Sequence, residues 1–178
     1  MFKHSKKLLQ TDCVVVSVND HTVYPIFRVG STSLFDSADK KFTNKEISQL
    51  ENITVLLRDP EERFVSGLNK YCWQHALDVD AVWNQVAKGN LIDRHFAPQY
   101  IWLVHLGVFY KGKVSLRPFS EIDQITDQHF ISVKDRNRKK QQVPAPKSFV
   151  NVDKRLFKYL NKEIVLPDLL KEFKDGLS

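Results

Sequence analysis

An arginine and a cluster of small residues follow the second apolar run of the chain. Gly30 permits a tight turn, and Ser31, Thr32 and Ser33 bring three hydroxyl groups after it. If a helix begins here, its free backbone amides and the positive end of its dipole can surround a phosphate or a sulfate. Arg28 adds a fixed positive charge. A loop of this composition is on its own more often a structural turn, so its weight depends on what stands beside it.

A second arginine, Arg58, ends the next apolar run and stands directly before a well-marked helix start. Asp59 suits the N-cap, and Pro60 suits the first helical position. Ser66 lies two turns into that helix. Ligands of open α/β sheets bind beyond the carboxyl ends of the strands, so two such junctions on neighbouring strands predict two anion sites at one edge. A nucleotide with phosphates on both sides of its ribose suits that arrangement.

The two segments together resemble the cofactor-binding motifs of sulfotransferases that use 3′-phosphoadenosine 5′-phosphosulfate (PAPS). YPIFRVGSTSL at 24–34 resembles the 5′-phosphosulfate loop of carbohydrate sulfotransferases, and LLRDPEERFVSGLNKY at 56–71 resembles their 3′-phosphate segment. The resemblance implies transfer of a sulfuryl group from PAPS to a hydroxyl acceptor, which we expect to be a glycan. The residues that it assigns to cofactor binding in these two motifs are Arg28, Val29, Gly30, Ser31, Thr32, Ser33, Arg58 and Ser66.

Weaker similarities follow in the same order. HFAPQ at 95–99 resembles a His-x-x-Pro-Gln segment of the Golgi members, and LRPFSEI at 116–122 resembles their late strand. The basic loop that carries Arg136 and Arg138 occupies the place of a family loop that closes over the nucleotide, so both arginines join the expected cofactor site. The resemblance covers most of the chain, but only the first two motifs are specific.

The catalytic groups depart from the family pattern. Arg28 stands where the family usually has lysine, and an arginine can stabilise negative charge but is a poor proton donor. Sulfuryl transfer also needs a base for the acceptor hydroxyl, and no histidine lies between the two motifs, where many relatives carry theirs. We favour His95, because imidazole has a suitable pKa, although it could instead only hydrogen-bond a neighbouring loop. The other candidates are Asp36, Asp39, Glu46 and Glu51.

The elements that must position these residues follow from apolar periodicity and turn signals. Alternating strands and helices predict an α/β fold in a single domain spanning 1–178. With the resemblance, we expect a P-loop-like three-layer fold whose central, mainly parallel sheet is flanked by helices. The expected strands are 13–18, 23–27, 53–59 and one on each side of the turn at 111–113. Two of the expected helices begin at 31 and 60, and the others cover 78–88, 120–130, 153–163 and 167–175. A basic loop is expected at 134–148.

Composition limits the remaining possibilities. The chain has 178 residues and a net charge of +6, which favours anionic partners. Cys13 and Cys72 are its two cysteines, expected as buried thiols, and no spacing suggests a metal site. We find no signal or membrane-spanning segment and expect a cytoplasmic protein without a membrane partner.

The alternative function is a noncatalytic basic domain that holds a nucleotide or a nucleic acid, although no nucleic-acid motif is present. A P-loop kinase is disfavoured because GxxxxGK[ST] is absent.

Overall fold

The structure is a computed structural model that describes residues 13–127 and 141–175. Within these ranges, six strands form one sheet in the order β3-β1-β2-β4-β5-β6. The pairs β2–β4 and β4–β5 are parallel, whereas β1–β2, β1–β3 and β5–β6 are antiparallel. The α/β class is therefore confirmed, but the sheet is mixed rather than mainly parallel. The strands are β1 (Val15–Val18), β2 (His21–Val23), β3 (Lys40–Phe42), β4 (Asn52–Leu57), β5 (Lys113–Pro118) and β6 (Lys162–Val165).

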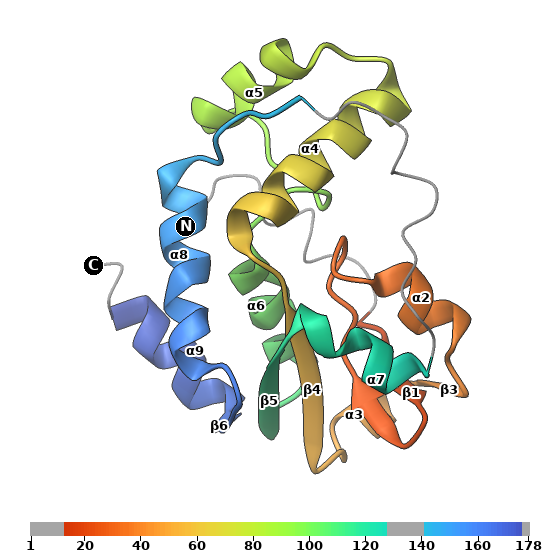
Figure 1. Cartoon of the computed structure of the whole chain (residues 1–178). Coiled ribbons are helices and arrows are strands. Elements are labelled where there is room, and N and C mark those ends of the chain that lie inside the picture. Colours follow the sequence, from red (N-terminus) through yellow and green to blue (C-terminus); the bar gives the residue numbers. More distant parts are fainter. Residues whose placement is uncertain (1–12, 128–140, 176–178) are drawn as a thin grey trace.

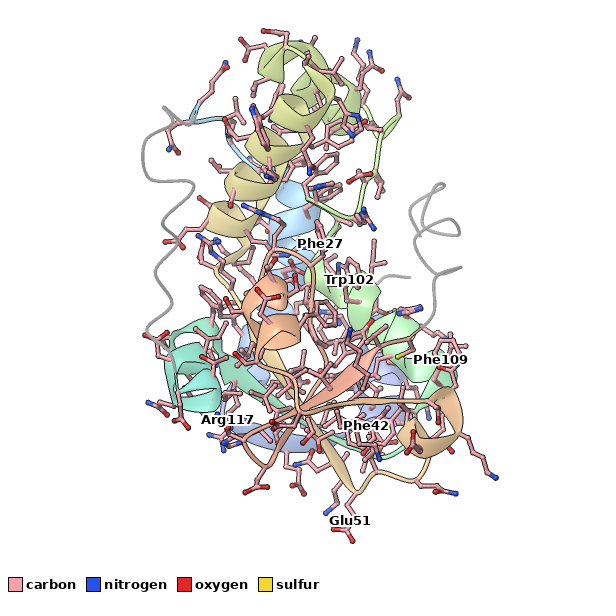
Figure 2. All side chains as sticks on the ribbon, turned by 90° about the vertical axis from the view of Figure 1, so that its right-hand side faces the viewer. Phe27, Phe42, Glu51, Trp102, Phe109 and Arg117 are labelled. Atoms are coloured by element: carbon pink, nitrogen blue, oxygen red, sulfur yellow. The ribbon has the colours of Figure 1, made fainter. Side chains whose placement is uncertain are left out.

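Helices flank the sheet and extend beyond one end of it. In both whole-chain views α7 lies on one side of the sheet and α6 on the other, while α4 and α5 project past the end of β4 (Figures 1 and 2). The helices are α2 (Ser31–Asp36), α3 (Asn44–Ile47), α4 (Pro60–His75), α5 (Val79–Ala87), α6 (Gln99–Phe109), α7 (Ile122–Thr126), α8 (Lys147–Leu156) and α9 (Leu166–Asp175), with short 3-10 turns η1 (Phe119–Glu121) and η2 (Phe157–Tyr159).

The apolar run before the turn at 111–113 is a helix, α6, and not the expected strand. Leu103, Leu106 and Tyr110 at its end are fully buried, and the helix packs against α8 and α9. A helix covered on several sides is apolar nearly all round, so its sequence has no helical period to read. Only the length of the run distinguishes it from a buried strand.

The C-terminal segment also differs from expectation. The helix expected over 153–163 begins earlier, as α8 at Lys147, and ends at Leu156. The chain then forms β6, which pairs antiparallel with β5 and is the last strand on that side of the sheet. The helix expected at 167–175 is present as α9. The expected helix at 120–130 is short, because η1 and α7 end by Thr126 and the residues after 127 lie outside the described ranges.

Helix α4 has the start that its sequence predicts. The Asp59 side chain caps it by accepting from the amides of Glu61 and Glu62, at 3.0 and 2.9 Å, and Pro60 is the first helical residue. Its apolar stripe enters a second hydrophobic cluster, separate from the one around the sheet. The buried members of this outer cluster are Phe64, Leu68, Cys72, Val82, Val86, Phe96 and Phe149.

Both cysteines are buried free thiols, as expected. None of the helices in the described ranges combines the length and the apolar character needed to cross a bilayer.

Candidate anion-binding site

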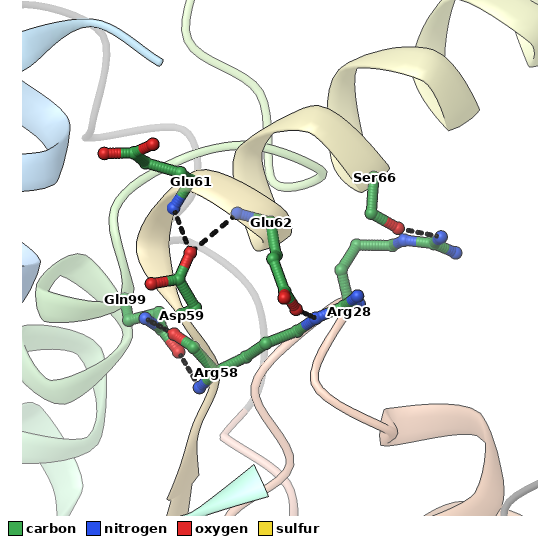
Figure 3. A network of polar contacts seen from close by, with 7 residues as sticks. All are labelled: Arg28, Arg58, Asp59, Glu61, Glu62, Ser66 and Gln99. Carbon is green, nitrogen blue, oxygen red and sulfur yellow. Dashed lines mark hydrogen bonds and ion pairs between the residues drawn. The ribbon is translucent and has the colours of Figure 1, made fainter. Parts of the chain in front are cut away.

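Two strand-to-helix junctions meet at one edge of the sheet. Strands β2 and β4 run parallel, with Val23 opposite Thr54, and the Tyr24 amide donates to the Thr54 carbonyl oxygen at 2.9 Å. The segments that follow the two strands therefore leave the sheet at the same edge. Arg28 comes from the first segment and Ser66 from α4 after the second, and Arg28 Nη2 donates to Ser66 Oγ at 2.8 Å (Figure 3). Residues from the two sequence motifs thus make direct contact.

The first junction is shaped by left-handed backbone. Arg28 has φ +67° and Gly30 has φ +68°, a region that is costly for residues with a side chain. Gly30 is the N-cap of α2, and a Cβ there would overlap the Ile122 side chain. Val29 is fully buried, and its amide donates to the Ile26 carbonyl oxygen at 3.0 Å.

The hydroxyl residues of this junction differ in exposure. Ser31 is buried, Ser33 is half-buried and Thr32 is exposed. They form the first turn of α2, which has only six residues. Its cap residue has no side chain, so the first amides of α2 receive no side-chain cap.

The second junction presents Arg58 beside its own helix. Arg58 Nε donates to Glu62 Oε2 at 3.5 Å, a long and partly exposed ion pair, and such surface pairs contribute little to stability. The guanidinium also lies 5.6 Å from the centre of the Phe119 ring. Neither contact is strong enough to keep the guanidinium from exchanging partners with a bound anion.

A groove of about 530 Å³ runs along the start of α4. Arg58 and Ser66 line it, and residues 142–145 form part of its wall. Three carboxylates, those of Asp59, Glu61 and Glu62, line the same groove. The groove therefore mixes a cation and a hydroxyl with acidic side chains that would weaken phosphate binding.

A buried polar network lies behind the two junctions. Arg63, on the first turn of α4, is 1% exposed. Its Nε and Nη2 donate to the Phe27 carbonyl oxygen at 3.2 and 3.0 Å, and its Nη1 donates to the Ala97 carbonyl oxygen. Arg63 thus ties the residue before Arg28 to α4 and to the segment before α6.

The charges of this network influence one another. Burial lowers the pKa of Arg63 to about 10; the buried Asp153 carboxylate opposes this effect, and the positive charges of Arg28 and Arg58 add to it. Burial raises the pKa of Asp153. Arg28, Arg58 and Arg63 are thus close enough for their charges to interact, and a bound anion would relieve the repulsion among them.

His95 lies next to the first junction but is covered. It is 5% exposed, and its Nδ1 shares a short hydrogen bond with Asp93 Oδ1. Burial raises the pKa of Asp93, but the hydrogen bonds from His95 outweigh this and leave that pKa lowered. The imidazole packs edge-on against the rings of Phe27, at 4.9 Å between centroids, and Tyr71, at 5.8 Å.

The carboxylate candidates for the base lie elsewhere. Glu51 precedes β4 and lies at the bottom of the molecule in Figure 2, well below Phe27, and is roughly 23 Å from Arg58 at about 3.3 Å per strand residue. Asp39 accepts from the Asn19 amide at the far turn between β1 and β2, at 3.0 Å. Hydrogen bonds from Lys40 and Thr43 lower the pKa of Glu46 to about 2, which makes it a weak base. Asp36 is exposed at the end of α2.

Sequence reasoning missed three residues of the buried network, Arg63, Gln99 and Asp153. Arg63 stands one position before Phe64, where the apolar stripe of α4 begins, and this position was the available sequence signal for it.

Arg136 and Arg138 lie outside the described residues. The described ranges contain no group of three or more His, Cys, Asp or Glu side chains that could hold a metal ion.

Searches against protein-family models, curated proteins and solved structures found no match for this chain.

Proposed function

We propose that this protein is a PAPS-dependent sulfotransferase that acts on a hydroxyl acceptor, with a glycan as the acceptor class. The observation that carries the proposal is the 2.8 Å contact between Arg28 and Ser66. It joins the two sequence segments that resemble the 5′-phosphosulfate and 3′-phosphate motifs. The proposal includes a P-loop-like arrangement at the parallel centre of the sheet, a cytoplasmic location without a membrane partner, and a share for Arg136 and Arg138 in nucleotide binding.

The residues of the site fit a nucleotide with separated phosphates. Arg58 and Ser66 would hold the 3′-phosphate, while Arg28 and the amides of 30–33 would hold the 5′ side. PAPS supplies the sulfuryl group, which passes to the acceptor oxygen as the sulfur–oxygen bond to the 5′-phosphate breaks. Arg28 then stabilises the negative charge that develops on the leaving phosphate, an effect that is largest where donors are already in position.

His95 is the base in this proposal. Its Nδ1 is held by Asp93, which leaves Nε2 as the nitrogen that takes the proton of the acceptor hydroxyl. Because the ring is 5% exposed, the acceptor has to approach past Phe27. His95→Gln should therefore reduce turnover without weakening nucleotide binding.

The burial of His95 also favours a second candidate function, a noncatalytic domain that holds the nucleotide. In that case Asp93 and His95 only anchor the segment before α6. Nucleotide binding would then persist in the absence of sulfuryl transfer to any of a panel of glycans offered with radiolabelled PAPS.

The first prediction tests the nucleotide site itself by calorimetric titration. The desulfated product, 3′-phosphoadenosine 5′-phosphate (PAP), should bind far better than AMP, because Arg58 and Ser66 contact only a 3′-phosphate. Hydrogen bonds to charged groups contribute about 1.5 to 3 kcal/mol, so Arg58→Ala should weaken PAP binding at least tenfold. AMP binding should change little. Equal affinities of the unmodified protein for PAP and AMP would overturn the assignment.

A further inference from the structure

Gln99 binds the backbone of Arg58, just after the last residue of strand β4 that pairs with β5. The β4–β5 ladder ends with Leu57 opposite Pro118, so the backbone groups of Arg58 lie just beyond the paired residues. Gln99 is fully buried, and its side-chain amide hydrogen-bonds both of these groups. Its Oε1 accepts from the Arg58 amide at 2.9 Å, and its Nε2 donates to the Arg58 carbonyl oxygen at 2.8 Å (Figure 3).

The orientation of the Gln99 amide is fixed by Asp153. Asp153 Oδ2 accepts from the Gln99 backbone amide at 2.9 Å and from Gln99 Nε2 at 3.3 Å, and Oδ1 accepts from the Tyr100 amide at 3.0 Å. A carboxylate accepts but does not donate, so the nitrogen of the Gln99 side chain must face it. The oxygen then faces the Arg58 amide. The carboxylate thereby sets which end of the Gln99 amide meets each backbone group of Arg58.

Among the described residues, the Arg58 side chain has weak restraints: the 3.5 Å pair with Glu62 and the distant Phe119 ring. The direction in which the guanidinium leaves the backbone therefore depends on how the Arg58 peptide groups are held. An apolar side chain of the size of Gln99 would fill the same volume but would hold neither group.

We propose that Gln99, oriented by Asp153, is a positioning residue that aims Arg58 at the 3′-phosphate. This inference rests on the proposed function and assigns a role to the end of the HFAPQ segment. Misplacement of a binding group by about 1 Å can cost on the order of 100-fold in rate. Loss of the Gln99 amide should accordingly affect recognition of the 3′-phosphate more than it affects the rest of the nucleotide.

The test combines nucleotide titration with amide hydrogen exchange followed by NMR. In Gln99→Met, PAP affinity should fall about tenfold, the size of a lost interaction of about 1.4 kcal/mol, while AMP affinity changes less than twofold. The Arg58 amide should exchange at least about tenfold faster, because its acceptor is gone. In an Arg58→Ala background the Gln99 substitution should have no further effect on PAP affinity.

Two further variants keep the test decisive. Leu103→Ala lies on the same helix and removes a fully buried side chain that does not hydrogen-bond Arg58. It should lower stability but leave the ratio of PAP to AMP affinity unchanged. If Gln99→Met does not fold, Gln99→Asn removes only one methylene and should show the same change in ratio, because the shorter amide does not reach both groups of Arg58.

The outcomes separate the two proposals. If the unmodified protein prefers PAP and the Gln99 variants keep that preference, the positioning role is wrong and the nucleotide site stands. If the unmodified protein does not distinguish PAP from AMP, both proposals fail. Unchanged exchange of the Arg58 amide in the Gln99 variants also overturns the positioning role, whatever the nucleotide data show.

Discussion

The junction before α2 and the junction before α4 present their arginines in different ways. The first relies on left-handed backbone at Arg28 and Gly30 and starts a helix of only six residues. The second starts a sixteen-residue helix capped by Asp59, and its arginine peptide is held by a buried glutamine. Arg63 from the second junction donates to the carbonyl oxygen of Phe27 in the first. The helix start of the second junction is thus set by local residues, whereas the first junction depends on a side chain from the second.

The largest expected effect comes from breaking that dependence. Arg63→Met leaves the carbonyl groups of Phe27 and Ala97 without their donor and removes the positive charge that favours the ionised form of Asp153. A buried polar group that loses its partner costs about 1 to 3 kcal/mol, so the two carbonyl groups together predict about 2 to 6 kcal/mol. We expect a loss of this size in the free energy of unfolding, measured by urea denaturation.

Arg155 provides the control for this experiment. Its Nη2 donates to the Glu172 carbonyl oxygen at 3.2 Å, and its guanidinium lies 4.4 Å from the Phe173 ring. Arg155→Met should cost less than Arg63→Met, because Arg155 is half-buried whereas Arg63 is 1% exposed. Equal losses in the two variants would show that Arg63 does not join the junctions.

The next effect concerns the arginine of the first junction. Arg28→Ala should reduce turnover about 100-fold to 1000-fold, as expected when a prepositioned donor to a developing charge is lost, with a smaller change in PAP affinity. Arg28→Lys should keep substantial activity. The measurement is transfer of radiolabelled sulfate to an acceptor found in the glycan panel.

Arg94→Ala is the matched control for charge. Arg94 is exposed, and its guanidinium lies 5.0 Å from the Phe27 ring, so it is a neighbour of the same loop. Its loss should change turnover only a few-fold. If Arg28→Ala kept the turnover of the unmodified protein, residues 25–34 would not form the transfer site.

The smallest effect compares two left-handed glycines. Gly30 has φ +68° and its Cβ position meets Ile122 and Phe119, whereas Gly89 has φ +73° and open space around it. Gly89→Ala should cost about 1 kcal/mol of strain alone. Gly30→Ala adds overpacking of about 1 kcal/mol or more. Thermal unfolding of both variants gives the difference, and equal losses would mean that the contact with α7 is easily relieved.

The parts that sequence could predict are those with local signals. Asp59 and Pro60 mark the start of α4, and the β-branched run before them marks β4, because caps and periodicity are properties of neighbouring residues. The sequence also predicted that the two motifs meet at the carboxyl ends of neighbouring parallel strands, and β2 and β4 are such neighbours. Arg28 and Ser66 lie together for that reason, although their direct contact was not foreseen.

The parts that sequence could not predict depend on distant partners. Helix α6 is apolar because α8, α9 and the sheet cover it, so its pattern does not separate helix from strand. The antiparallel edges formed by β3 and β6 arise from short strands of three and four residues, too short to show a period. The Gln99–Asp153 contact joins positions 54 residues apart, and neither residue has a local feature that indicates a buried role.

The separation of the hydrophobic interior into two clusters has a consequence for motion. The outer cluster has far fewer buried side chains than the cluster around the sheet, so opening it costs less free energy than unfolding the whole domain. Ser66 is carried by the same helix that supplies Phe64 and Leu68 to the outer cluster, whereas Arg28 follows β2 of the sheet. A ligand held by both residues would add a link between the outer cluster and the sheet, beside those that Arg63 and the Arg28–Ser66 hydrogen bond already make.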